Sequence, residues 1–211
     1  MPAILSTGRN QVLVLDFGER LFCVALFAAM LSRFWDAVIH GHSIAVYSIL
    51  LVELSIILFT LIRRPATNIS IDPVDWTIAV MATCAPMLVI PSSSAPIAPA
   101  PLWTFFLCFG VALQICGKLA LNRRFGVLPA NRGLAAKGPY AFVRHPIYCG
   151  YTITHIGFVL MAPNAWNLLV YVTGFILQVV RILREETLLV QDAEYREYQK
   201  RVRYRLFPGI F

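Results

Sequence analysis

The chain has 211 residues, of which 58% are hydrophobic and only 14% are charged, and its mean hydropathy is +0.69. These values exclude an ordinary soluble domain and predict a single integral membrane domain over residues 1–211. The net charge of +7 does not indicate a nucleic-acid partner, because the basic residues lie mainly in short loops and in the tail. We therefore expect this charge to orient the chain in a membrane.

Long apolar segments predict a bundle of membrane-spanning helices. A spanning helix needs about 20 mostly apolar residues. Six segments are candidates, the first and third being the weakest: residues 21–39, 43–62, 76–90, 102–121, 147–161 and 165–183. The expected fold class is all-α, a polytopic transmembrane protein. Residues 1–121 would form an N-terminal transmembrane scaffold, and residues 122–211 would carry most of the polar chemistry.

Glu53 is the exception within an otherwise plain N-terminal scaffold. Its carboxylate lies near the middle of the second predicted span. It is either a protonated or hydrogen-bonded packing residue or a group beside a substrate cavity. The cysteines form no C-x-x-C pair and lie within apolar segments, so we expect no metal or disulfide role for them: Cys23, Cys84, Cys108, Cys116 and Cys149.

Basic residues are concentrated in alternate loops. Arg63 and Arg64 follow the second predicted span, five Lys or Arg residues lie within residues 122–144, and others close the chain. The intervening loops, residues 40–42, 91–101 and 163–164, contain no Lys or Arg. Under the positive-inside rule, both termini and the Arg-rich loops face the cytoplasm.

A loop rich in glycine and proline leads into the C-terminal helices. Within residues 122–144 the helix-breaking residues are Gly126, Pro129, Gly133, Gly138 and Pro139. They predict a structured turn region rather than a helix. The next helix is expected to begin at His145-Pro146, because proline suits the first helical turn. Residues 162–164 form a short link to the following helix, so we expect a tight antiparallel C-terminal hairpin.

Two polar stripes should face each other in this hairpin. On the incoming helix, Tyr148, Thr152 and His155 share one face, and on the outgoing helix so do Gly174, Gln178, Arg181 and Glu185. Interhelical hydrogen bonding is one explanation for Thr152 and Gln178, and a lone His155 is commonly a packed core histidine. The charged pair Arg181 and Glu185 lies at the membrane edge beside a polar loop, which favours a ligand site.

The tail beyond the last predicted span has two interpretations. Its early part is amphipathic with a helical period, while Pro208 and Gly209 stop any helix. It either anchors the protein at head-group depth through its aromatic residues, or folds back as a lid over the mouth of the hairpin. As a lid, its Tyr and Arg side chains would cover a polar cofactor.

Several short motifs follow one another around the hairpin. They are Gly138-Pro139-Tyr140, Arg144-His145-Pro146-Ile147-Tyr148, Arg181 with Glu185-Glu186 before Leu188, and Glu194-Tyr195 with Tyr198, Val202 and Pro208. Their order and spacing resemble the isoprenylcysteine carboxyl methyltransferase family. The resemblance covers residues 122–211 and implies a cofactor-binding catalytic region there. It implies that S-adenosylmethionine binds from the cytosol beneath a C-terminal cover, and that a lipophilic substrate enters sideways from the membrane.

The resemblance also implies roles for individual residues. The cofactor contacts would be Leu134, Tyr140, His145, Pro146, Ile147, Tyr148 and Glu185. Arg181 would bind the substrate and act as the catalytic residue. The implied protein is a multi-pass membrane enzyme whose active site faces the cytoplasm and uses no metal. Its partners would be a lipophilic methyl acceptor and membrane lipid.

The chemistry of methyl transfer suits these residue types. Transfer from a sulfonium to a carboxylate cancels opposite charges, so a site that excludes water favours it, and the main task is alignment. Arg181 would hold the carboxylate through a bidentate fork. The expected reaction is carboxyl O-methylation of an isoprenylcysteine-like or small lipophilic carboxylate. An amine or thiol acceptor would instead need a base, for which His155 and Glu53 are candidates.

Three other interpretations stay open. Related membrane methyltransferases act on phospholipid head-group amines or on small thiols. Sterol reductases end in a similar Arg-His-Pro motif and Tyr-rich tail and use NADPH, although their membrane region is much longer. In the third interpretation the hairpin binds a lipid or a partner helix without turnover. Acceptor profiling and cofactor binding separate these possibilities.

Overall fold

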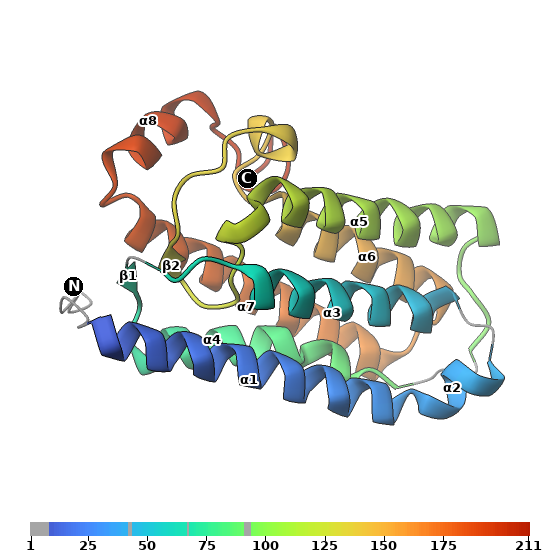
Figure 1. Cartoon of the computed structure of the whole chain (residues 1–211). Coiled ribbons are helices and arrows are strands. Elements are labelled where there is room, and N and C mark those ends of the chain that lie inside the picture. The colour runs from blue at the N-terminus through green and yellow to red at the C-terminus, as the bar shows by residue number, and fades with distance from the viewer. Residues whose placement is uncertain (1–8, 42–43, 67, 91–93) are drawn as a thin grey trace.

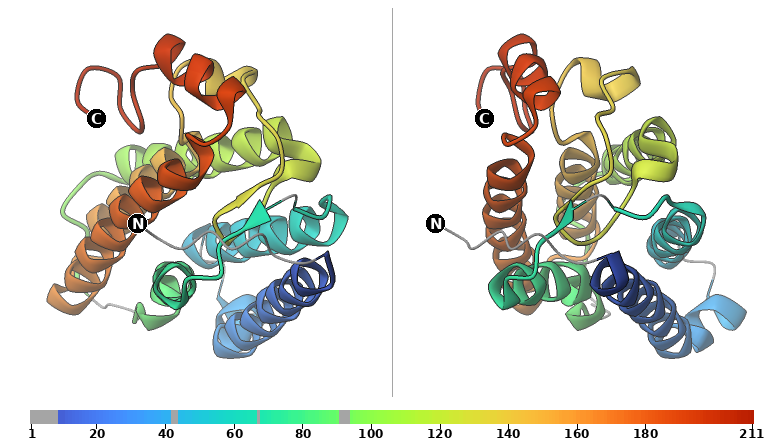
Figure 2. Two further views of the ribbon diagram at one scale, coloured as in Figure 1. Left: turned by 90° about the vertical axis from the view of Figure 1, so that its left-hand side faces the viewer. Right: turned by 60° about the vertical axis from the view of Figure 1, so that its left-hand side comes forward.

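The computed structural model describes residues 9–41, 44–66, 68–90 and 94–211 (Figure 1). Long helices lie alongside one another as a bundle, and a short C-terminal helix sits at one end of it (Figures 1 and 2). The helices are α1 (Arg9–Arg33), α2 (Trp35–His40), α3 (Ile44–Ile62), α4 (Pro73–Cys84), α5 (Ala100–Leu121), α6 (Pro146–Met161), α7 (Ala165–Leu189) and α8 (Ala193–Arg201). Short 3₁₀ turns lie at η1 (Ala85–Leu88), η2 (Asn122–Arg124) and η3 (Gly138–Ala141).

The predicted helical fold is confirmed, because each predicted span contains a helix. Among the described residues, two helices are long and apolar enough to cross a membrane, Ala100–Arg124 and Ala165–Leu189. Val46–Ile62 and Pro73–Leu88 are shorter apolar helices. The number of membrane spans stays a prediction.

The boundaries predicted for the first helix, residues 21–39, are wrong. Helix α1 begins at Arg9 and ends at Arg33, and α2 follows after a turn at Phe34. Charged residues near the start of α1 lowered the hydropathy of this segment. The structure buries Asp16 and Glu19 in ion pairs with Arg63, with N–O distances of 2.7 and 2.5 Å. Paired charges are tolerated inside a helical bundle, so the helix extends through them.

The loop before α6 is a turn region, as predicted, and it includes a strand that the sequence did not indicate. Strand β2 (Ala130–Asn131) pairs antiparallel with β1 (Asn68–Ile69), which follows α3. Ile69 lies opposite Ala130 in this pairing and is buried. The short ladder ties the C-terminal loop to the N-terminal half of the chain.

Helix α6 packs most extensively on α5. The short link predicted at residues 162–164 joins α6 to α7, and the two helices contact through His155 and Tyr171, whose ring centroids lie 4.6 Å apart. Glycines allow the close approach of α5 and α6. A Cβ built on Gly150 would lie 2.8 Å from the carbonyl oxygen of Gly110, and one on Gly110 would lie 2.7 Å from the backbone nitrogen of Thr154. Helices α6 and α7 meet less closely, which leaves room for cavities between their polar faces.

Gly150→Ala should lower the stability of the protein, because the added methyl group meets backbone atoms that have no flexible side chain to move aside. Overpacking of this kind costs about 1–3 kcal/mol. Gly18→Ala is the matched control, since nothing lies within 4 Å of the Cβ position in α1. Thermal unfolding in detergent should show a lower midpoint for Gly150→Ala only. Equal midpoints for the two variants would contradict the glycine-mediated packing.

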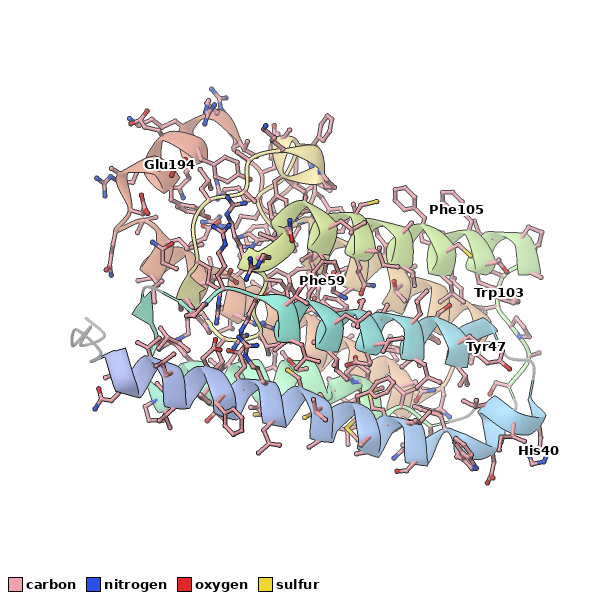
Figure 3. The ribbon with its side chains drawn as sticks, in the orientation of Figure 1. His40, Tyr47, Phe59, Trp103, Phe105 and Glu194 are labelled. Atoms are coloured by element: carbon pink, nitrogen blue, oxygen red, sulfur yellow. The ribbon has the colours of Figure 1, made fainter. Side chains whose placement is uncertain are left out.

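The segments that carry most of the polar motif residues lie at one end of the bundle. Helix α8, the C-terminal tail and the loop before α6 lie at the end where α1 begins and α7 finishes (Figures 1 and 2). Glu194 marks this end, whereas His40, Tyr47 and Trp103 lie toward the other end, and Phe105 projects outward from α5 (Figure 3). Phe105 is 58% exposed, as expected for a side chain that contacts lipid.

Candidate cofactor and acceptor site

An open cavity lies at the polar end of the bundle. Its empty volume, including the space at its mouth, is about 1040 Å³. Its walls come from the loop before α6, the first turns of α6, the last turns of α7 and helix α8. The predicted site residues that line it are Leu134, Tyr140, His145, Ile147, Tyr148, Arg181 and Glu185. Most of the predicted site is therefore brought together in one place.

Pro146 is the predicted contact that does not line this cavity. It occupies the first turn of α6 and is fully buried. Proline is suited to this position because its fixed backbone angle is already helical. Pro146 thus begins the helix whose neighbouring residues, His145 and Ile147, face the cavity. Its own contact with a cofactor stays a prediction.

Glu185 and Tyr148 form a polar wall of the cavity. The Tyr148 hydroxyl donates to Oε2 of Glu185 at 3.0 Å. The guanidinium carbon of Arg181 lies over the Tyr148 ring, 5.1 Å from its centroid. A carboxylate, a phenol and a guanidinium therefore surround one space, which suits a ligand with groups of both charges.

Part of the hydrogen-bonding capacity of Arg181 is used within the protein. One of its terminal nitrogens, Nη2, donates to the backbone carbonyl of Val127 in the cavity loop. Its Nε is buried and has no hydrogen-bond partner among the described residues. The guanidinium thus supports the loop while keeping a donor for another group. The substrate role of Arg181 stays a prediction.

Glu186 points away from Glu185 and holds several elements together. It is 4% exposed, and its carboxylate accepts from Nε of Arg144 at 2.7 Å and from Nε of Arg205 at 2.9 Å. Nε2 of His145 lies 3.1 Å from the same carboxylate. Glu186 therefore joins α7, the turn before α6 and the C-terminal tail. Of the two adjacent carboxylates, Glu185 lines the cavity and Glu186 stabilises the packing of the surrounding elements.

Helix α8 lies beside the cavity, as the lid interpretation predicts. Tyr195 and Tyr198 line the cavity and are almost completely buried. The Tyr198 hydroxyl donates to the backbone carbonyl of Tyr140 at 2.7 Å. Burial raises the pKa of Tyr198 to about 12, so its hydroxyl stays a neutral donor near pH 7. This bond joins α8 to the loop before α6.

The chain beyond α8 runs back toward the start of α6. The backbone N–H of Arg144 donates to the carbonyl of Tyr204, and the N–H of His145 donates to the carbonyl of Arg205, both at 2.9 Å. The Arg144 side chain also donates to the carbonyl of Val202 at 3.0 Å. The tail therefore fixes the turn that presents His145 to the cavity.

Glu19 holds the cavity loop from the N-terminal half of the chain. Its Oε1 accepts from the backbone N–H groups of Val127 and Leu128 at 2.6 and 3.1 Å. Arg132, which lines the cavity, lies 3.3 Å from its Oε2. The expectation that Glu53 is the only chemistry in the N-terminal scaffold is therefore wrong. Glu19 and Val127 are 108 positions apart, and no local pattern signals such a contact.

The cavity lining fits S-adenosylmethionine, which carries an amino acid group, a sulfonium and an adenine. Carboxylates are available from Glu185 and Asp192, and cations from Arg124 and Arg132, with tyrosine rings between them. Nε of Arg132 is buried without a hydrogen-bond partner in the described part of the chain. A buried unsatisfied donor in a cavity wall is a common mark of a missing ligand or water.

Metal-binding residues do not gather in the described ranges. No group of three or more His, Cys, Asp or Glu side chains there could hold a metal ion. The five cysteines are free, and Cys23 and Cys149 are buried. Buried free cysteine behaves as a small apolar residue.

A smaller inner chamber adjoins the cavity. Its cavity volume is about 20 Å³, room for about one water molecule. It shares Ile56, Thr83, Tyr148, Tyr151 and Arg181 with the larger cavity. The rest of its lining is Glu53, Ala82, Pro86, His155 and Gln178. Part of each predicted polar stripe therefore lines this chamber: Tyr148 and His155 on α6, and Gln178 and Arg181 on α7. Gly174 and Glu185 of the α7 stripe do not line it. Thr152 lies outside it and donates its hydroxyl to the Tyr148 carbonyl at 3.0 Å.

An apolar groove lies on the outer side of α6 and α7. Its empty volume is about 690 Å³, and its lining is Thr152, His155, Ile156, Val159, Leu160, Leu168, Tyr171, Val172 and Phe175. Leu168 and Val172 are 50% and 48% exposed. His155 borders both this groove and the inner chamber. In a membrane, the groove would face lipid chains.

Residues 100–196 match the family model described as phospholipid methyltransferase. No curated protein matches the chain. The matched segment includes α5, α6 and α7, the cavity loop and the start of α8, but not Glu19, Glu53 or the tail. The chain is thus similar to phospholipid methyltransferases, members of the same membrane methyltransferase superfamily as the isoprenylcysteine enzymes, and not specifically to the latter.

Proposed function

We propose that this protein is a membrane methyltransferase that uses S-adenosylmethionine to methylate a lipophilic acceptor. The observation that carries the proposal is that three spaces lie next to one another. A polar cavity at the end of the bundle shares lining residues with a small polar chamber, and His155 lines both this chamber and an apolar outer groove. A water-soluble cofactor and a lipid acceptor could then approach one another from opposite sides.

The residues that would hold the cofactor are those predicted from the sequence: Leu134, Tyr140, His145, Ile147, Tyr148 and Glu185, with Pro146 shaping the turn between them. When bound, the cofactor supplies a methyl group on a positively charged sulfur. The Glu185 carboxylate favours a cationic ligand. The Tyr198 hydroxyl binds the carbonyl of Tyr140 and so holds α8 beside the cavity. A cofactor bound there would displace water, and a drier site strengthens such charge interactions.

One acceptor consistent with the site is a lipophilic carboxylate. Arg181 lies between the cavity and the chamber and is 8% exposed. Its Nε is free to donate to a carboxylate, and a charge-assisted bond of this kind gives both affinity and orientation. A carboxylate nucleophile needs no base. This reading supports the carboxyl O-methylation expected from the sequence.

The second candidate acceptor is the head-group amine of a phospholipid. Two observations favour it: the match of residues 100–196 to phospholipid methyltransferases, and the position of Glu53 in the inner chamber. An amine loses one N–H proton for each methyl group that it gains. His155 and Glu53 are candidates to take up that proton.

We also propose that the protein is a multi-pass membrane protein whose site faces the cytoplasm. The Arg-rich loop and the C-terminal tail lie at the same end of the bundle (Figure 2). Residues of this loop and of α8 line the cavity. The positive-inside rule places such segments on the cytoplasmic side. Anionic lipid head groups there would attract the basic residues of α8.

Binding of S-adenosylmethionine to the detergent-purified protein tests the function. Calorimetry with NADPH as comparator should show binding of S-adenosylmethionine only. Glu185→Gln should weaken this binding by about tenfold to a hundredfold, the usual worth of a hydrogen bond to a charged group. His145→Ala should also weaken it.

Glu194→Gln is the matched control for this measurement. Glu194 lies on α8 and is exposed, so its replacement should leave affinity unchanged. Binding of NADPH alone would favour a reductase. Failure of a well-folded protein to bind either ligand would support lipid or partner binding without turnover and overturn the proposed function.

A further inference from the structure

The chain beyond α8 folds back along the long helices, at the periphery of the bundle on the side away from α1 (Figure 2). Leu206 is 1% exposed and lies in a buried cluster with Tyr148 at the start of α6 and Ile182 on α7. Ile182 lies about two turns before the end of α7, a helix long and apolar enough to cross a membrane. Residues 205–211, which we call the C-terminal wedge, are therefore attached to the flank of this helix.

The main chain of the C-terminal wedge bonds largely to itself. Three consecutive N–H groups, those of residues 205–207, donate to the main-chain oxygen of Phe211 at 2.8, 2.8 and 3.2 Å. The N–H groups of Ile210 and Phe211 donate to the carbonyl of Phe207, both at 3.2 Å, and Pro208 has no N–H. Such closure suits an irregular segment at a membrane boundary, because little water is available there to bond with the backbone.

Two apolar side chains project from segments at this end of the molecule. Ile210 of the C-terminal wedge is 85% exposed and Phe142, in the turn before α6, is 73% exposed, the largest values for large apolar side chains in the described ranges. The turn that carries Phe142 also lies beside a membrane helix, since a Cβ built on Gly138 would lie 3.6 Å from the Cβ of Ala120 in the last turn of α5. Both side chains therefore lie near the level at which a long apolar helix ends.

Cationic residues lead into the C-terminal wedge. Arg201 is the last residue of α8 and Arg203 follows it, and both are exposed. Tyr204 is 39% exposed, and no Asp or Glu follows Glu197 in the sequence. The order of arginine, tyrosine and apolar residues matches the change from anionic head groups to hydrocarbon across a membrane surface.

We propose that the C-terminal wedge docks into the lipid surface of the cytoplasmic leaflet. Ile210 lies at the boundary of the hydrocarbon, and Arg201 and Arg203 lie among anionic head groups. Phe142 is a second apolar contact with the same surface. This lipid surface is distinct from the methyl acceptor, because none of residues 201–211 lines the cofactor cavity or the outer groove.

The C-terminal wedge also connects the lipid surface to the cavity. The carbonyl of Arg205 accepts from the N–H of His145 at 2.9 Å, and Nε of Arg205 donates to Glu186 at 2.9 Å. His145 lines the cavity. A surface that holds the wedge thus favours the observed arrangement of the turn at His145. Given the methyltransferase function proposed above, anionic lipid strengthens the binding of S-adenosylmethionine.

Fluorescence quenching in lipid nanodiscs tests the docking without any cofactor. Ile210→Trp adds one indole to the four of the wild type, so its emission is the difference between the two proteins. In nanodiscs of phosphatidylcholine and phosphatidylglycerol, lipids brominated in the upper acyl chain should quench this emission, and aqueous iodide should not. Glu194→Trp is the matched control at an exposed position of α8, and it should show the opposite pattern.

Two quenching results would overturn the docking. Quenching of Ile210→Trp by iodide would place the C-terminal wedge in water. Resistance to both agents would place it against protein, such as a second copy of the chain.

Calorimetry in the same nanodiscs measures the effect on the cofactor. Arg203→Gln should weaken the binding of S-adenosylmethionine about twofold to fivefold, because one arginine near an anionic surface is worth about fivefold. In phosphatidylcholine alone it should have no effect. Arg64→Gln is the matched control, since Arg64 is exposed in the segment after α3 and lies outside the C-terminal wedge. It should leave the affinity unchanged in both lipids.

The two measurements separate the docking from the methyltransferase function. Wild type that binds no S-adenosylmethionine, while bromolipid still quenches Ile210→Trp, would overturn the function and leave the docking in place. Iodide quenching with intact cofactor binding would do the reverse. Equal losses for Arg203→Gln in both kinds of nanodisc would overturn the effect of anionic lipid, because Arg203 would then act within the protein.

Discussion

Replacement of Glu186 by Gln should destabilise the protein by about 3–5 kcal/mol, the usual cost of removing one partner from a buried ion pair. Glu186 is 4% exposed and faces Arg144, His145 and Arg205. Without its charge, these side chains lose their shared anion in a buried place. Because they connect the turn before α6 to the tail, binding of S-adenosylmethionine should be lost as well. Thermal unfolding and calorimetry in detergent measure the two effects.

Glu185→Gln is the closest control, since it makes the same chemical change one position earlier. Glu185 faces the cavity and is held by the Tyr148 hydroxyl. Its replacement should weaken cofactor binding but leave the unfolding midpoint near that of wild type. The adjacent glutamates thus separate binding from stability. An unfolding midpoint for Glu186→Gln equal to that of wild type would contradict the role of Glu186 as the junction of the tail.

The C-terminal part of the site was predictable because its signals are local. Tyr148, Arg181 and Glu185 lie at helical spacing on two adjacent helices, and His145-Pro146 marks the start of one of them. The structure brings most of these side chains to one cavity. Helical periodicity fixes which residues share a face, so this part of the site follows from the pattern.

Other features depend on contacts between distant segments. The pairing of β1 with β2, and the close packing of α5 on α6 through Gly110 and Gly150, have no periodic signature of their own. Glu186 was predicted only as part of a motif, and its neighbour Glu185 has the same side chain. Which of two adjacent carboxylates faces a cavity is decided by the tertiary packing around the helix.

The anchoring of the cavity loop by Glu19 gives the second large expected effect. Glu19→Ala should lower the affinity for S-adenosylmethionine by at least about tenfold, because two hydrogen bonds to a buried carboxylate are lost. The peptide group between Val127 and Leu128 donates its N–H, that of Leu128, to Glu19 and offers its carbonyl, that of Val127, to Arg181. Release of this peptide should therefore disturb Arg181 too, and the KM for the acceptor should rise together with the dissociation constant of the cofactor.

Asp16→Ala separates this anchoring role from general stability. Asp16 belongs to the same buried ion cluster, pairing with Arg20 at 2.9 Å and with Arg63 at 2.7 Å, but Glu19 is the carboxylate that accepts from the loop N–H groups. Both variants should lower the unfolding midpoint, since each removes one of the two carboxylates that pair with buried Arg63. Only Glu19→Ala should weaken ligand binding in protein that is still folded. Equal losses of affinity in the two variants would mean that the cluster stabilises the bundle without positioning the loop.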